Sequence, residues 1–166
     1  MKKFCKWTVL CLIVLLGVTG CGFLKAITGD PFAGDWIGIA KIPNIGKSLL
    51  RVKIEPEDNE RYRVRATAEN YQQKQEEGDN RRAEKRFVWR TGAELRFIGQ
   101  LESDTLHLNK MMQLYLRLGR ITDTLCLPDG TEIHKDTGKE YPALKEELRK
   151  MTEAEHPGAV FEDIKN

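Results

Sequence analysis

The sequence predicts a mainly β protein, an antiparallel meander that closes into a small barrel of eight or nine strands, followed by one C-terminal amphipathic helix. Apolar and polar residues alternate with a period of two in short segments, as at Leu50, Val52 and Ile54. Turn residues separate these segments, and after Pro142 the apolar period becomes that of a helix. Closure removes the two exposed edges that would otherwise pair with other chains.

Nine segments have the strand pattern, and most connections between them are short enough to be hairpins. Thr91-Gly92-Ala93 and Pro128-Asp129-Gly130 are predicted turns, the second because Pro fixes φ and Gly takes a positive φ. The polar stretch 72–82 predicts a long exposed hairpin loop. The expected strands are 35–42, 48–55, 60–71, 83–91, 94–100, 104–109, 113–118, 120–127 and 131–135.

One amphipathic helix of about fourteen residues follows the barrel. Its apolar stripe is Leu144, Leu148 and Met151. His156-Pro157-Gly158 ends the helix, and we place its start near Tyr141, although Thr137 and Glu140 have the spacing of a capping box. We expect the stripe to cover one mouth or flank of the barrel; the alternative is a docking helix for another protein.

The first twenty residues differ in composition from the rest of the chain. The 166 residues carry 27 Lys and Arg against 25 Asp and Glu, a formal net charge of +2. Residues 1–20 hold Lys2, Lys3 and Lys6 and no acid, so the remainder carries 24 basic against 25 acidic residues, or about −1. A near-neutral chain of mixed sign offers no electrostatic case for a nucleic-acid partner.

This leader has the parts of an export signal, a basic start, an apolar stretch and small residues. Its end, Val18-Thr19-Gly20-Cys21, resembles the lipobox of bacterial lipoprotein precursors. The resemblance implies that Cys21 receives diacylglycerol, that cleavage precedes it, and that its new amine is acylated, as with palmitate. Gly22 is not the aspartate that such families use for inner-membrane retention, which implies the outer membrane in a two-membrane source and otherwise the outer face of the cell membrane.

An uncleaved membrane anchor is the alternative, because residues 7–24 contain no charge. In the lipoprotein interpretation Cys5 and Cys11 leave with the leader, and Cys126 remains without a disulfide partner, as a packing residue. The expected divisions are a cleaved signal peptide at 1–20, a lipidated tether at 21–34, the barrel domain at 35–137, and the helix and tail at 138–166.

Phe32-Ala33-Gly34-Asp35-Trp36, which opens the meander, resembles the Gly-x-Trp start of lipocalin-like barrels. In that family the tryptophan plugs the closed end, and the resemblance implies a ligand-holding cup. Thr122-Asp123-Thr124 departs from the family pattern, with threonine where tyrosine belongs, and no partner arginine can be assigned among Arg117, Arg120 and the other arginines.

Motifs for catalysis are missing from the sequence. Gly46-Lys47-Ser48 imitates a phosphate-binding loop, but Lys41 stands where the first glycine is needed. Ser48 and Ser103 are the only serines and neither lies in Gly-x-Ser-x-Gly. The three histidines, His107, His134 and His156, are far apart. We expect neither enzyme activity, nor a cofactor, nor a metal.

Two surface questions stay open in the sequence. Arg61, Arg63 and Arg65 share one strand face, which is either a solvated surface with ion pairs or a patch for an anionic headgroup or acidic partner. The interior is either filled by its own large side chains or holds a small apolar ligand. The residues that would contact such a ligand are Trp36, Tyr62, Trp89 and Phe97.

The sequence therefore predicts a noncatalytic, membrane-anchored lipoprotein of the cell envelope with a binding or assembly role. Its expected partners are the membrane, through lipidated Cys21, and an envelope protein. The alternative is a lipocalin-like carrier of a small apolar molecule or lipid.

Overall fold

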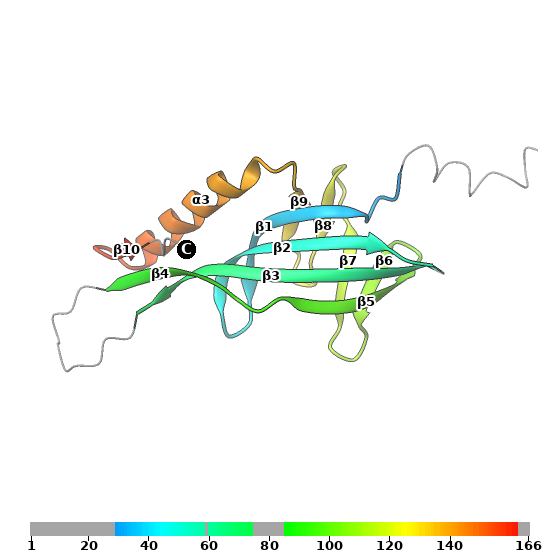
Figure 1. Ribbon diagram of the computed structural model, residues 1–166, viewed down its shortest axis with the longest axis horizontal. Coiled ribbons are helices and arrows are strands. Elements are labelled where there is room, and N and C mark those ends of the chain that lie inside the picture. Colours follow the sequence, from blue (N-terminus) through cyan, green and yellow to red (C-terminus); the bar gives the residue numbers. More distant parts are fainter. Residues whose placement is uncertain (1–28, 59, 75–84, 163–166) are drawn as a thin grey trace, which may run out of the picture. The chain divides into compact units, whose positions relative to one another are not determined.

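The structure is a computed structural model that describes residues 29–58, 60–74 and 85–162. The chain divides into two compact units, 1–31 and 32–166, and the fold below is that of the second unit. In its described part the elements follow in the order β1 (Gly34–Ile42), β2 (Gly46–Pro56), β3 (Arg61–Gln73), β4 (Arg86–Thr91), β5 (Leu95–Glu102), β6 (Thr105–Asn109), β7 (Leu114–Leu118), β8 (Thr124–Cys126), β9 (Glu132–Lys135), α3 (Glu140–Glu155) and β10 (Val160–Glu162) (Figure 1).

Eight strands form a closed antiparallel barrel, which confirms the predicted fold class. Around the barrel the strands stand in the order β3, β2, β1, β9, β8, β7, β6 and β5, and β5 pairs back onto β3. The closure between β9 and β1 brings Lys135 opposite Trp36. Most of the expected strands agree with the observed ones to within three residues, but β8 is much shorter than 120–127 because residues 119–123 form a loop.

The prediction of a turn at Thr91-Gly92-Ala93 between two paired strands was wrong. β4 and β5 both pair with the same edge of β3, β4 with residues 69–73 and β5 with residues 61–66. β3 is thirteen residues long, so two strands can pair one after the other along the same edge. Between them, the Gly92 N–H donates to the Ala68 carbonyl (2.8 Å). β4 thereby leaves the barrel, and the short β10, which the pattern did not predict, pairs in parallel with it.

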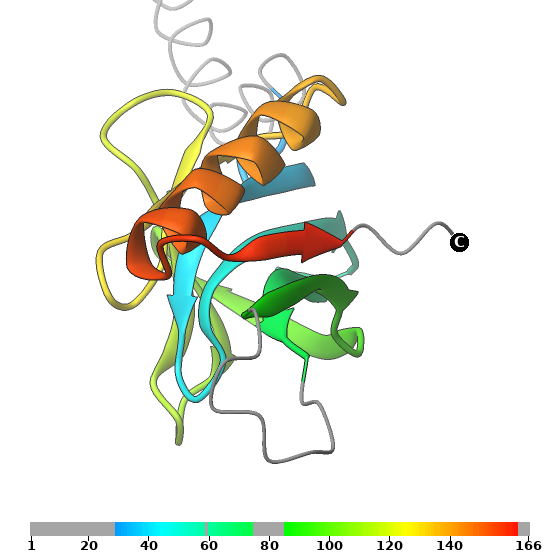
Figure 2. The same ribbon diagram turned by 90° about the vertical axis from the view of Figure 1, so that its left-hand side faces the viewer.

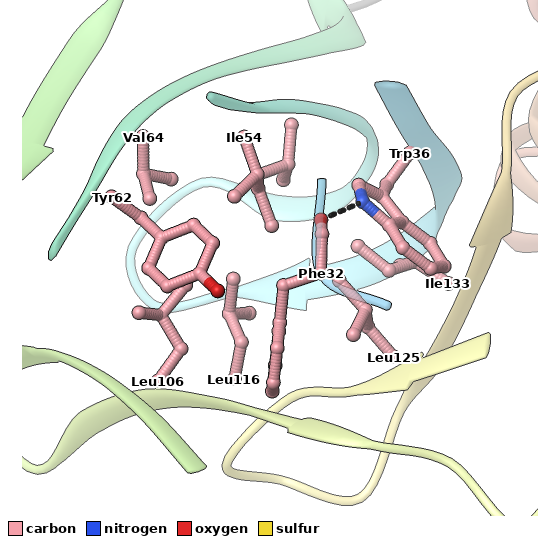
Figure 3. Packing of buried hydrophobic residues seen from close by; sticks show 10 residues of the cluster. Phe32, Trp36, Ile54, Tyr62, Val64, Leu106, Leu116, Leu125 and Ile133 are labelled. Carbon is pink, nitrogen blue, oxygen red and sulfur yellow. Dashed lines mark hydrogen bonds between the residues drawn. The ribbon is translucent and has the colours of Figure 1, made fainter. Parts of the chain in front are cut away.

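The barrel interior contains one apolar cluster near the end where β1 begins. The alternation of β1, β2 and β3 turns Trp36, Ile54 and Val64 inward. Figure 3 shows Phe32 among these side chains, with the Trp36 Nε1–H donating to the Phe32 carbonyl at 2.9 Å. Phe32 is 1% exposed, so the folded domain begins there and not near Asp35. The cluster consists of Phe32, Trp36, Val52, Ile54, Tyr62, Val64, Leu106, Leu116, Leu125 and Ile133.

A second layer covers the outer face of the barrel wall. Figure 2 shows α3 running across the sheet with β10 beside it. Leu148 of α3 packs on Ile37 of β1 and Leu49 of β2, so the helix covers a flank of the barrel. The helix starts at Glu140, one residue before the predicted start, because the Thr137 N–H and hydroxyl both donate to the Glu140 carboxylate (2.9 and 2.7 Å).

Candidate binding surfaces

The four aromatic residues predicted to contact a ligand do not line one space. Trp36 and Tyr62 are buried in the interior cluster, and Phe97 packs against it. Trp89 lies outside the barrel, in the layer beneath α3, because β4 leaves the barrel wall. Its Nε1–H donates to Glu69 of β3 (3.2 Å). Only three of the four residues therefore belong to the barrel interior.

The end of the barrel where β1 begins, which we call the closed end, contains the buried rings of Phe32 and Trp36 and a lysine over the Trp36 ring. The Lys135 Nζ lies 5.2 Å from the centre of the Trp36 ring, within range of a cation–π interaction. Lys135 of β9 supplies this cation. Nothing in the sequence singled out Lys135, because it meets Trp36 only through the closure of the barrel.

The opposite end of the barrel carries exposed apolar side chains. Ile45 lies in the β1–β2 turn, Met111 and Met112 lie in the β6–β7 turn, and Leu95 begins β5. Met111 is 92% exposed, Met112 74%, Leu95 57% and Ile45 50%. Figures 1 and 2 both place the two turns at the same end of the barrel. We call these four residues the apolar rim.

A polar cleft of about 250 Å³ lies on the outer wall of the barrel. It combines three cations from β2 and β3 with carboxylates from β1, from the β4–β5 connection and from the segment after β9. The charged residues that line it are Asp35, Arg51, Lys53, Arg65, Glu94 and Asp136. Lys53 and Arg65 both pair with Glu55, at 3.3 and 2.9 Å, and hold the pKa of that carboxyl below its usual value.

The arginine face of β3 is paired with acids. Arg63 contacts Glu57 at 2.5 Å, and the Arg65 Nη2 lies 2.9 Å from both carboxylate oxygens of Glu55. Arg61 projects from the same face and is exposed. For Arg63, which does not line the cleft, the ion pair with Glu57 favours a solvated surface over a free basic patch.

A buried carboxylate connects the cleft to the helix. Glu69 is 4% exposed and accepts a hydrogen bond from the Tyr141 hydroxyl at 2.7 Å. Arg51, whose guanidinium lies over the Tyr141 ring, approaches the other Glu69 oxygen at 3.5 Å. Burial, together with Glu69, raises the pKa of Tyr141 to about 12. The sequence did not predict this network, because Glu69 continues the outward polar positions of β3.

Side chains with catalytic or metal-binding potential stand apart. Within the described ranges, no three His, Cys, Asp or Glu side chains are grouped as metal ligands. The buried Ser48 hydroxyl donates to the Gly46 carbonyl (3.3 Å). Burial, and then Glu132, raise the pKa of the Cys126 thiol, which disfavours the reactive thiolate.

The predicted lipidation site, Cys21, lies outside the described residues. Among those that are described, no helix has the length and apolar character needed to cross a bilayer. The chain matches no protein family, no curated protein and no solved structure. The basis for a functional proposal is therefore the leader sequence together with the surfaces of the barrel.

Proposed function

We propose that this protein is a membrane-anchored lipoprotein of the cell envelope, held by lipid on Cys21, whose barrel binds another envelope protein without catalysis. The observation that carries the binding role is the apolar rim. Of the seven large apolar side chains exposed in the described part of the chain, four belong to it. Large exposed apolar side chains gathered at one end of a domain mark a candidate interaction site, and methionine adapts its shape to a partner.

The position of the rim supports a protein partner. β1 begins at Gly34, which pairs with Ile54, and turns back at the other end, where Ile42 pairs with Gly46. The chain thus enters the barrel at the end opposite the rim. Residues 22–31, between Cys21 and Phe32, span at most about 35 Å when extended. The chain from Cys21 therefore joins the barrel at the end opposite the rim, so the rim does not take part in this connection.

The packed interior supports a scaffold role. Trp36, Tyr62 and Phe32 are at most 2% exposed, and they fill the barrel at its closed end. Gly38 illustrates how tight this packing is, because a Cβ atom there would lie 2.8 Å from the Ile133 Cγ2. A barrel of eight strands is just wide enough for such side chains.

Mass spectrometry of the mature protein tests the anchor. We expect the chain to begin at Cys21 and to carry the mass of its acyl chains, and Cys21→Ser to abolish both cleavage and lipid. A mature protein that starts at Met1, or one with an unmodified Cys21, would contradict the lipoprotein proposal.

Site-specific photocrosslinking in cells tests the rim. We expect a crosslinker at Met112 to capture one discrete envelope protein, and the same crosslinker at Ile121 to capture none. Ile121 is a matched control because it is 65% exposed and lies in the β7–β8 loop, at the other end of the barrel. Replacing Met111 and Ile45 by Ser should remove the Met112 product. Equal products from positions 112 and 121 would exclude the rim as the binding surface.

A lipocalin-like binder of a small apolar molecule is the second candidate. Leu95 pairs with the inward-facing Ala66 yet is 57% exposed, and Leu50, Phe97 and Leu108 are only partly buried. The interior is thus less completely covered near the rim than at the closed end. If this candidate is right, fatty acid will quench Trp36 fluorescence saturably in a Trp89→Phe variant, and Leu95→Glu will abolish the quenching. An unchanged signal would reject it.

A further inference from the structure

We infer that the polar cleft on the outer wall of the barrel binds a small zwitterion that carries an ammonium group and a phosphate, with phosphoethanolamine as its simplest form. The cleft is distinct from the apolar rim, so this inference goes beyond the proposed protein-binding role. It follows from three features: the cations Arg51, Lys53 and Arg65 that line the cleft, the carboxylates beside them, and the contacts of Arg51 with Tyr141 and Glu69.

The cations stand opposite one another on neighbouring strands. Lys53 of β2 pairs in register with Arg65 of β3, and Arg65 pairs in register with Arg96 of β5. Like charges at directly opposed positions destabilise a sheet. An anion placed over Lys53 and Arg65 would offset this repulsion. Glu55 does so in part, but it leaves further N–H donors of both cations for a ligand.

Arg51 is the third cation, and the protein holds it in place. Its guanidinium contacts both the ring of Tyr141, 5.7 Å from the ring centre, and the carboxylate of Glu69, at 3.5 Å. Glu69 is in turn fixed by hydrogen bonds from Tyr141 and Trp89. This buried support orients Arg51 at the cleft before any ligand arrives, which lowers the entropic cost of binding. Three cations, two of them forked guanidinium groups, suit a phosphate with its several oxygens.

The acidic wall lies directly beside the cations. Asp35 of β1 pairs in register with Lys53, and the Asp136 N–H donates to the Asp35 carbonyl at 2.8 Å. The two aspartates therefore border the same side of the cleft. Glu94 also lines the cleft, and Glu55 adds a carboxylate between Lys53 and Arg65, so a bare anion gains little net attraction. A ligand with both charges can place its ammonium at the aspartates and its phosphate at the cations.

Calorimetry on the mature full-length protein in nonionic detergent tests the inference. We expect O-phosphoethanolamine to bind saturably and at least about ten-fold more tightly than inorganic phosphate or ethanolamine alone, since each charged hydrogen bond adds roughly this factor. Equal affinity for phosphate would overturn the zwitterion, and no saturable binding of any of the three would overturn the site.

Two variants separate the halves of the site. Arg65→Gln should weaken phosphoethanolamine binding about ten-fold, whereas Arg63→Gln should leave it unchanged. Arg63 is the matched control, because it projects from the same face of β3 and has its own ion pair with Glu57, but does not line the cleft. Asp35→Asn should weaken phosphoethanolamine binding without weakening phosphate binding. Equal losses in the Arg65 and Arg63 variants would contradict the assignment.

The ligand has two possible sources with the same chemistry, a free zwitterion or a phospholipid headgroup. Phosphatidylethanolamine added to the micelles will compete with soluble phosphoethanolamine if the headgroup enters the cleft, and phosphatidylglycerol, which has no ammonium, will not. No competition by either lipid assigns the site to the free zwitterion, and equal competition by both overturns the role of the ammonium. Crosslinking at Met112 and the mass of Cys21 are unaffected by this outcome, so the two proposals fail separately.

Discussion

The barrel interior and the layer beneath α3 are both packed, but different forces hold them. The interior buries ten apolar or aromatic side chains in one cluster. The outer layer has a smaller buried apolar cluster, Ile37, Leu49 and Leu148, and it also contains the buried ring of Phe87 and the buried carboxylate of Glu69. The interior therefore depends on the removal of apolar area from water, whereas the helix depends on a few specific polar and aromatic partners.

Aromatic rings extend the outer layer away from the barrel. Tyr71 of β3 contacts Trp89 of β4 and Phe161 of β10, with ring centres 4.8 and 5.0 Å apart. The Lys145 Nζ of α3 lies 4.7 Å from the Trp89 ring. These contacts join the helix to strands that do not belong to the barrel. The comparison predicts that the outer layer can be loosened while the barrel stays folded.

The largest expected effect is in the interior. Leu106 is fully buried, so Leu106→Ala should lower the free energy of unfolding by about 2–5 kcal/mol, measured by urea denaturation. Ile98→Ala is the control, because Ile98 is half exposed on the outer face of β5, and should cost well below about 1 kcal/mol. Similar losses in both variants would contradict the view that interior burial holds the barrel.

Glu69 gives the next largest effect. Glu69→Ala leaves the Tyr141 hydroxyl and the Trp89 N–H without their acceptor, and should cost about 1–3 kcal/mol. Hydrogen exchange should accelerate in α3 and remain slow in β6 and β7. Glu94→Ala, at an exposed carboxylate, should change neither. If the barrel strands lost protection together with α3, the two regions would form one cooperative unit.

Alkaline pH should weaken the outer layer through Tyr141. Its pKa is about 12 in the folded protein, above the ordinary value of 10, because of burial and Glu69. The stability from this group is complete below pH 10 and is lost as the pH rises to about 12. Tyr141→Phe should remove this part of the alkaline loss of helix signal in circular dichroism. A variant that keeps the full alkaline loss would assign it to another group.

The smallest effect concerns the helix start. Thr137 and nearby backbone N–H groups lower the pKa of Glu140 to about 2. Its contribution is therefore present above pH 4.5 and is lost as the pH falls through about 2. Thr137→Ala should flatten this acid dependence in hydrogen exchange at the first turn of α3 and leave the barrel unchanged. A dependence as steep as in the parent protein would show that Thr137 does not stabilise the carboxylate.

Strand faces could be predicted from the sequence, whereas contacts between distant strands could not. Tyr62 and Val64 point inward and Arg63 points outward, as their alternation requires. The same alternation placed Trp89 in register with Phe87, but it does not say whether β4 belongs to the barrel. Whether β4 belongs to the barrel depends on how many residues of the β3 edge pair with β5, because β4 pairs with the residues that remain. The cleft was missed for the same reason, since Asp136 and Glu94 join Arg51 and Lys53 only in the folded chain.

The sequence by itself determined the local features, namely the alternating strands and the amphipathic stripe of α3, because each depends on neighbouring residues. The tertiary structure alone decided that Lys135 covers Trp36, that Phe32 begins the core, and that Glu69 supports Arg51. These groups meet because β9 pairs with β1, and because β4 and β5 pair with successive parts of the same edge of β3. A period-two pattern specifies which face a side chain occupies, but the neighbour it meets there is set by strand pairing.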